Sequence, residues 1–124
     1  KNYQEAEELC RRLVKCRMDT LGPDHSDTIK SKNMLVSTLE VRGDLRGAEE
    51  VQDEICLHSL RTLGLDHPDT LSDKQKLATI LHARGDPDQA ETILREVLSS
   101  RVLKLGHDHY ETAWTKHLLT KTLA

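Results

Sequence analysis

Histidine is the residue type whose spacing first suggests a chemical function in this sequence. Three of its seven histidines, His25, His67 and His109, recur at a constant interval. Zinc would need such side chains to converge on one ion at about 2 Å. If each interval is one helical unit, equivalent side chains in neighbouring units are about 8–10 Å apart and cannot share an ion. We therefore expect these histidines to pack into and hydrogen-bond the connecting segments that hold them, and we expect no metal and no cofactor.

Cysteine is the other residue type that could be reactive here. A nucleophilic cysteine needs a nearby base and an oxyanion donor, and the sequence supplies no such arrangement around Cys10, Cys16 or Cys56. The glycines are isolated and form no phosphate-binding loop. We therefore expect no enzymatic activity. Three cysteines at unrelated spacings also argue against a disulfide framework and favour a reducing compartment, which predicts a cytoplasmic location.

Composition excludes two further classes of partner. The sequence has 18 Lys and Arg residues and 21 Asp and Glu residues, and it lacks the basic patch that binding to nucleic acid or a membrane surface requires. No apolar run approaches the roughly 18 residues of a transmembrane helix. We therefore expect neither nucleic acid nor a membrane as a partner. The chain begins at Lys1 rather than at a methionine, so we expect it to be part of a longer protein.

An internal repeat indicates which elements would position any site. Residues 21–28 (LGPDHSDT) recur as 63–70 (LGLDHPDT) and as 105–112 (LGHDHYET), so the connectors begin at the evenly spaced positions 21, 63 and 105, with a period of 42. Between these connectors, apolar residues follow the helical spacing i, i+3, i+4, i+7, i+8. In one copy this stripe consists of Ala90, Ile93, Leu94, Val97 and Leu98.

Capping residues divide each repeat into a first and a second helix. Asp44 and Asp86 suit the start of the second helix, and Gly22, Gly64 and Gly106 suit the left-handed residue that follows its end. The helices are expected at residues 2–20, 26–42, 46–62, 68–84, 88–104 and 110–124, to within about two to four residues.

We therefore predict an all-α fold, an α-solenoid of stacked antiparallel helix pairs with about six helices. A single array would cover residues 1–124. It would consist of the second helix of a partial repeat, two full repeats and the first helix of a partial repeat, at residues 1–20, 21–62, 63–104 and 105–124. Lys32, Lys74 and Lys116 also recur at the period of the repeat. Their aliphatic stems are expected to cover apolar surface while the ammonium groups reach water.

The residues of the repeat resemble one family in particular. Its period is compatible with HEAT, armadillo and propeller repeats, but no unit shows the four short strands of a propeller blade. The tetratricopeptide pattern, with a small residue early in the second helix, is similar to Leu77-Ala78, Leu81, Gly85-Asp86, Ala90 and Val97. The longer unit and its connector resemble the kinesin-light-chain type of this repeat. That type also occurs in arrays attached to NACHT or NB-ARC domains of fungal immune-receptor-like proteins.

The resemblance implies a protein-protein interaction scaffold, because tetratricopeptide arrays typically bind extended peptides on a concave surface lined by their first helices. Carried over position by position, the groove candidates are Lys30, Asn33, Met34, Ser37 and Glu40, then Ser72, Gln75, Lys76, Thr79 and His82, and finally Trp114, His117 and Lys121. This set contains three lysines and a single acidic residue, so its net charge is positive. The expected ligand is therefore a polar or acidic peptide segment.

A departure from the family pattern keeps an alternative function open. Kinesin-light-chain repeats usually carry an Asn before the buried Leu of the first helix, where this chain has Met34, Lys76 and Leu118. The alternative is a structural or regulatory array, within kinesin light chain or a larger nucleotide-binding immune-receptor-like protein, that binds no free peptide and contacts flanking repeats. An isolated piece has apolar residues at both ends, among them Leu9 and Leu119, so we expect it to self-associate head to tail.

Overall fold

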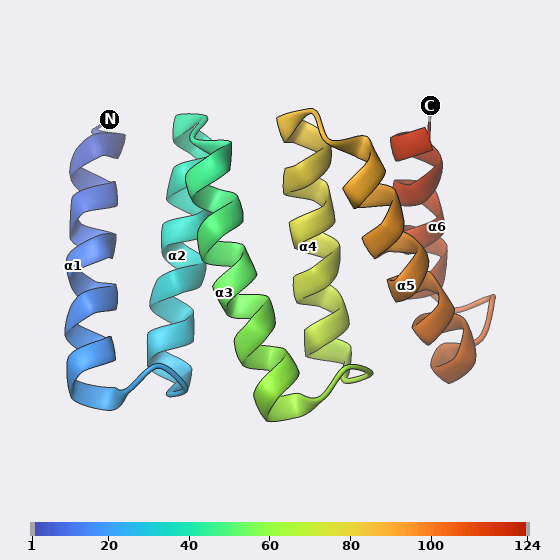
Figure 1. Ribbon diagram of the computed structural model, residues 1–124, viewed down its shortest axis with the longest axis horizontal. Helices are drawn as coiled ribbons and strands as arrows, with labels where there is room; N and C mark the ends of the chain where they lie inside the picture. The colour runs from blue at the N-terminus through green and yellow to red at the C-terminus, as the bar shows by residue number, and fades with distance from the viewer. Residues whose placement is uncertain (1, 124) are drawn as a thin grey trace. The chain divides into compact units, whose positions relative to one another are not determined.

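The structure of the protein is a computed structural model that describes residues 2–123. In this range the chain forms six α-helices and no strand (Figure 1). The helices are α1 (Tyr3–Leu21), α2 (Ser26–Arg42), α3 (Leu45–Leu63), α4 (Pro68–Arg84), α5 (Pro87–Leu105) and α6 (Tyr110–Leu123). Each bound agrees with the expected one to within one residue, except that the expected end at Ala124 lies outside the described residues.

The chain forms two compact units, residues 1–62 and 63–124. In the first unit α1 packs antiparallel to α2, and α3 follows α2 after a two-residue turn (Figure 1). In the second unit α5 packs against both α4 and α6, and α4 also contacts α6. The all-α fold built from antiparallel helix pairs, predicted from the repeat, is therefore confirmed.

Each unit has a core formed by the apolar stripes of its helices. In the first unit Leu39 of α2 and Ile55 of α3 are fully buried. In the second unit the fully buried side chains include Leu81 of α4 and Ala90 and Val97 of α5. Helical spacing places each stripe on one face, and removing that face from water is the main stabilising contribution to packing.

Each end helix has both an exposed and a covered apolar residue among the positions expected to lack cover, with Cys10 of α1 only 8% exposed. Leu9 of α1 is 57% exposed and Leu123 of α6 is 54% exposed, as expected for end helices. Leu119 of α6, which the sequence also marks as uncovered, is only 8% exposed. That expectation was wrong for Leu119 because α5 packs on α6 and covers it.

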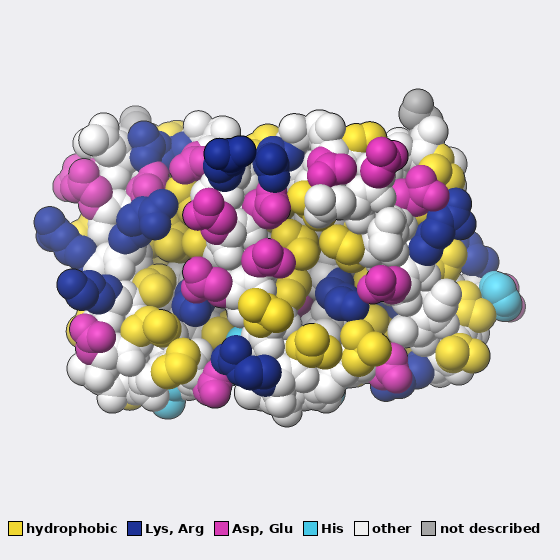
Figure 2. Space-filling model, viewed as in Figure 1, with side chains coloured by type: hydrophobic (Ala, Val, Ile, Leu, Met, Phe, Trp, Pro, Cys, Tyr) yellow, Lys and Arg dark blue, Asp and Glu magenta, His cyan; other side chains and the backbone are white. Residues whose placement is uncertain are grey.

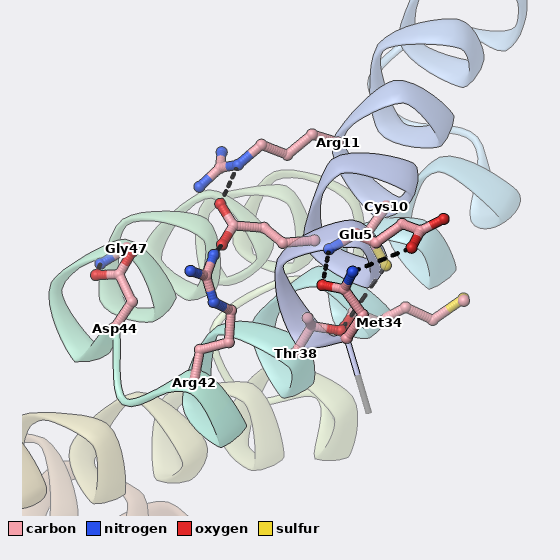
Figure 3. A network of polar contacts seen from close by, with 10 residues as sticks. Glu5, Cys10, Arg11, Met34, Thr38, Arg42, Asp44 and Gly47 are labelled. Atoms are coloured by element: carbon pink, nitrogen blue, oxygen red, sulfur yellow. Dashed lines mark hydrogen bonds and ion pairs between the residues drawn. The ribbon is translucent and has the colours of Figure 1, made fainter.

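The predicted aspartate caps begin α3 and α5. Asp44 Oδ1 accepts a hydrogen bond from the Gly47 amide at 3.0 Å, and Asp86 Oδ1 accepts one from the Gln89 amide at 3.3 Å. Gly47 lies off the repeat pattern, and the cap supplies the reason: a Cβ at Gly47 would lie 2.7 Å from Asp44 Oδ2 (Figure 3). The close approach of the capping carboxylate therefore favours glycine at this position.

The glycines after the helices adopt two different conformations. Gly43 and Gly85, which end α2 and α4, lie in the left-handed helical region, with φ 83° and 97° and ψ 8° and 20°. Gly22 and Gly106, which end α1 and α5, combine φ 91° and 86° with ψ 165° and 167°. The predicted left-handed cap was therefore right in the sign of φ and wrong in ψ. The chain leaves the second helix in an extended conformation that is essentially restricted to glycine.

Candidate functional site

The periodic histidines cap the first helices. Nδ1 of His25, His67 and His109 accepts a hydrogen bond of 3.1 Å from the backbone amide two residues further along. This is the bond that a capping Asn or Asp makes with its side-chain oxygen. The expected hydrogen-bonding role of these histidines in the connectors is confirmed. The described residues also contain no group of three or more His, Cys, Asp or Glu side chains placed to hold a metal ion.

The predicted groove residues lie on the first helices of the repeats. Lys30, Asn33, Met34, Ser37 and Glu40 lie on α2, Ser72, Gln75, Lys76, Thr79 and His82 lie on α4, and Trp114, His117 and Lys121 lie on α6. All of them are exposed or half-buried, whereas the neighbouring core residues of the same helices are buried. Of this set, the structure brings Ser72, Gln75, Trp114 and His117 together around one pocket.

This pocket lies in the second unit, between α4, α5 and α6, and has a volume of about 580 Å³. Its lining consists of Ser72, Gln75, Arg101, Tyr110, Glu111, Ala113, Trp114 and His117. The Trp114 and His117 rings stack with their centroids 5.4 Å apart, and both side chains are exposed. The pocket therefore combines an aromatic wall on α6 with polar groups on α4 and a charged group on α5.

Arg101 is the basic residue of the pocket, which the acidic residue Glu111 also lines, and it was not predicted from the sequence. The residue is 3% exposed, and its Nη1 donates to Gln75 Oε1 at 2.6 Å and to Thr115 Oγ1 at 2.8 Å. Longer hydrogen bonds run from Nη1 to the Glu111 carbonyl at 3.4 Å and from Nη2 to Ser72 Oγ at 3.3 Å. Among the described residues, the acceptors around this guanidinium are neutral oxygens rather than carboxylates.

Burial and charge act on Arg101 in opposite directions. Desolvation by burial lowers the pKa of Arg101, and the nearby acidic groups of Glu111 and Tyr110 oppose that shift. An arginine stays protonated in any case, so the pocket contains a positive charge at low dielectric. Such a charge is a potential anchor for an anion.

Arg17 makes the corresponding hydrogen bonds in the first unit. It lies two periods before Arg101, and its Nη1 donates to the Asp27 carbonyl at 2.9 Å and to Ser31 Oγ at 2.7 Å. The intermediate repeat has Ser59 at this position. In two of the three copies, an arginine on the second helix of one repeat thus binds the first helix of the following repeat. The hydrogen bonds to α4 are made by Arg101 and not by Arg17.

Two of the three periodic lysines form ion pairs with the second helix of the same repeat. Lys32 Nζ lies 2.9 Å from Glu54 Oε1, and Lys74 Nζ lies 3.2 Å from Glu96 Oε2. The Lys32 side chain is 7% exposed. The stems of Lys32 and Lys74 are covered as predicted, but their ammonium groups bind glutamates, and Lys116 is exposed. The third lysine, Lys116, lies 3.3 Å from Nδ1 of His107.

Two carboxylates of the first unit bind basic side chains from other parts of that unit. Glu7 pairs with Arg11 at 2.7 Å and with Arg42, whose guanidinium reaches it from the end of α2 (Figure 3). Asp24 pairs with His58 at 3.0 Å and with Arg61 at 2.9 Å, both on α3. The hydrogen bonds from these partners hold the pKa of Glu7 and of Asp24 below the usual values. On the face drawn in Figure 2, basic and acidic side chains are likewise interspersed.

Comparisons with known proteins agree with this geometry. The sequence model of the tetratricopeptide repeat matches residues 1–27, 28–69 and 74–111. No curated protein matches the chain. None of the helices in residues 2–123 is long and apolar enough to cross a bilayer.

Solved structures of kinesin-light-chain-like repeats have the same fold. Two crystal structures show the nearly identical TPR-like repeats of a Podosopora anserina protein assigned as a kinesin light chain. One is a form with a single substitution, and both are 25% identical to this chain, with TM-scores of 0.84 and 0.83. BtubC (BKLC) from P. vanneervenii is 17% identical, with a TM-score of 0.83. The chain is covered to 97% in each case, but it spans 57%, 57% and 48% of those chains. Together with the period of the repeat, these matches show that the chain belongs to the tetratricopeptide repeat family and has the fold of kinesin-light-chain-like repeats.

Proposed function

We propose that this chain is a non-catalytic protein-interaction module whose second unit binds an extended peptide segment through a carboxylate. Tetratricopeptide repeats are protein-interaction scaffolds, and the pocket between α4 and α6 supports a more specific ligand. The observation that carries the proposal is Arg101, a buried cation that lines the pocket and donates its hydrogen bonds to neutral oxygens, while the carboxylate of Glu111 lies in the same lining. A carboxylate brought to this guanidinium interacts at low dielectric and therefore more strongly than at an exposed lysine.

The remaining walls of the pocket suit an aspartate or glutamate side chain. The hydrogen bond from Arg101 Nη2 to Ser72 Oγ, at 3.3 Å, is among the longest that the guanidinium makes, so an entering carboxylate replaces Ser72 most readily. Ala113 and Trp114 offer apolar surface to the methylene groups beside that carboxylate. The ligand that fits is thus a peptide in which an acidic residue is flanked by an apolar one.

Fluorescence anisotropy with a short labelled peptide tests this proposal. The peptide is prepared in an acidic version and in a matched version with Gln and Asn in place of Glu and Asp. Ala113→Glu places a carboxylate at the exposed rim of the pocket and leaves Arg101 unchanged. We expect it to weaken binding of the acidic peptide about tenfold, because like charges repel at close range. Thr120→Glu adds the same charge to an exposed position of α6 that does not line the pocket, and we expect little effect.

Two results would contradict the proposal. One is equal affinity for the acidic and the amide peptide, and the other is equal weakening by Ala113→Glu and Thr120→Glu. Circular dichroism of each variant verifies that the helices are retained. A further variant, in which Lys30, Lys76 and Lys121 are changed to Glu, tests the lysines of the first helices. Unchanged affinity of that variant would remove these lysines from the proposed site.

A structural or regulatory array without free-peptide binding is the second candidate function. Its support is the replacement of the expected Asn by Met34, Lys76 and Leu118 at the positions that face the groove in kinesin-light-chain repeats. In that case flanking repeats of kinesin light chain or of a larger nucleotide-binding immune-receptor-like protein are the partners. Failure of every acidic peptide to bind the wild-type chain would favour this candidate. A cytoplasmic location fits both candidates, because Cys10, Cys16 and Cys56 form no disulfide in the structure.

For an isolated copy we also propose head-to-tail self-association that is opposed by one charge. Lys74 pairs with Glu96 in the second unit. The position equivalent to Lys74 in α6 is Lys116, one period later. The position equivalent to Glu96 in α1 is Arg12, two periods earlier. If α1 of a second copy packed on α6 in the repeat register, Arg12 would therefore meet Lys116 and the two charges would repel. Sedimentation should show stronger association for Arg12→Glu than for Lys15→Glu, and strict monomers in both variants would refute the contact.

A further inference from the structure

The caps that His25, His67 and His109 form depend on an unprotonated Nδ1. Nδ1 of His67 and of His109 accepts an amide hydrogen bond, so the ring proton lies on Nε2. A second proton on the ring would convert Nδ1 into a donor and abolish the cap. It would also place a positive charge at the start of α4 and of α6, where the helix dipole is itself positive. Both consequences destabilise the first turn of the helix.

The first unit contains a histidine whose response to acid is the opposite. His58 Nδ1 lies 3.0 Å from Asp24 Oδ1, and Arg61 Nη2 binds the same oxygen at 2.9 Å. Protonation of His58 turns the first of these contacts into a charged pair. The first unit therefore gains one interaction while it loses the cap that His25 forms.

The second unit lacks this compensation. Ser100 occupies the position of His58 and donates to Asp66 Oδ1 at 3.2 Å, a contact that contains no imidazole. His107 Nδ1 lies 3.3 Å from Lys116 Nζ and accepts from it. Protonation of His107 would replace this hydrogen bond by repulsion between two cations. Acid thus acts on three contacts of the second unit in the same direction.

Charged and titratable groups around the two caps offset this loss only in part. At the start of α4 they are Asp66, Asp69 and Lys104 of α5, and at the start of α6 they are Asp108, Glu111, Tyr110 and Arg101 of α5. The carboxylates attract an imidazolium, but such pairs near the surface contribute little, whereas loss of a cap typically costs more. Lys104 and Arg101, which bind connector carbonyls beside the caps, oppose a further positive charge.

We propose that the second unit is the proton-sensitive half of the chain. Protonation of His67 and His109, reinforced by His107, loosens the first turns of α4 and α6 at mildly acidic pH. The first unit is less sensitive, because it loses one cap, that of His25, where the second unit loses two, and because protonation strengthens its contact between His58 and Asp24. This inference is independent of peptide binding, since it concerns the unfolding equilibrium of each unit.

The test follows urea unfolding at pH 7.5 and pH 5.0 with two signals. Fluorescence of Trp114, the only tryptophan of the sequence, reports the second unit, and circular dichroism reports all helices. The unfolding midpoint is compared rather than the intensity, because His117 stacks on Trp114 and alters its emission on protonation. We expect the fluorescence-detected folding constant of the wild-type chain to fall about tenfold between the two pH values, which corresponds to one to two lost caps.

Asparagine at the caps provides the decisive variant. Its Oδ1 takes the place of Nδ1 and accepts the amide hydrogen bond at both pH values. We expect the His67→Asn, His109→Asn variant to lose most of the pH dependence, while the matched His25→Asn variant of the first unit retains it. A wild-type chain with the same fluorescence midpoint at both pH values would refute the proposal, as would a double variant as sensitive to acid as the wild type.

Discussion

Ala90 offers a direct measurement of how tightly the helix pairs pack. It is fully buried in the first turns of α5, at the position that the tetratricopeptide pattern reserves for a small residue. Ala90→Leu adds three carbon atoms where the side chain has no exposed surface, so either the partner helix must move or the new side chain must adopt a strained rotamer. Movement of α5 is costly in addition, because Asp86 fixes its start through the Gln89 amide. We expect a loss of about 1–3 kcal/mol.

Thermal unfolding followed by circular dichroism measures this loss. For a chain of this size a destabilisation of about 1–3 kcal/mol lowers Tm by about 4–12 °C. Thr79→Leu is the matched control, since Thr79 is exposed on α4 and its hydroxyl bonds only the Gln75 carbonyl of its own helix. Its Tm should change by much less. Equal shifts in the two variants would mean that the buried and exposed faces of the helices have been assigned incorrectly.

Three further predictions concern charge and backbone. A double-mutant cycle with Lys32→Met and Glu54→Gln, measured by urea unfolding, should give a coupling of about 0.5–1 kcal/mol, because Glu54 is more than half exposed; no coupling would contradict the pairing. Because the pKa of Glu7 is lowered in the folded state, its contribution is complete above the unfolded pKa and is lost as the pH falls through the folded value. Unfolding at pH 5 and pH 3 should therefore show a smaller acid-induced loss in Glu7→Gln than in the wild type. Gly85→Ala should lower the free energy of unfolding by about 1 kcal/mol, because φ is 97° there, and an unchanged Tm would refute this reasoning.

The helices could be predicted from the sequence because each signal recurs: the connector and the apolar stripe occur three times and the capping aspartate twice. The connector, the apolar stripe and the capping aspartates recur at one period. A wrong helix boundary in one copy would therefore disagree with the boundaries in the other copies. The lysine-glutamate pairs could have been found in the same way. Lys74 and Glu96 are 22 residues apart, and Lys32 and Glu54 have the same spacing, which keeps both charges in register with the repeat.

The pocket could not be predicted by this reasoning, because its central residue is not periodic throughout. Arg101 corresponds to Arg17, but Ser59 lies between them, and the identity of the repeat therefore gives no reason to select it. The hydrogen bonds to Ser72 and Gln75 depend on how α5 packs between its two neighbours, which is a property of the tertiary structure. The exposed faces of α4 and α6 were located correctly, and the buried cation beside them was not.

The hydrogen bonds of the connectors and of Arg101 have a consequence for how the chain folds and changes length. Within the described residues, the side-chain hydrogen bonds named above join positions fewer than 40 residues apart in the sequence. The bond that Thr115 Oγ1 donates to Gln75 Oε1 spans 40 residues. Each bond therefore closes within one period, and the contact order of each unit is low, which favours rapid folding of neighbouring segments. The histidine caps and the lysine-glutamate pairs each lie within one repeat, so duplication or deletion of one repeat in the gene would supply or remove both partners together, and the number of repeats can change without new partners having to evolve.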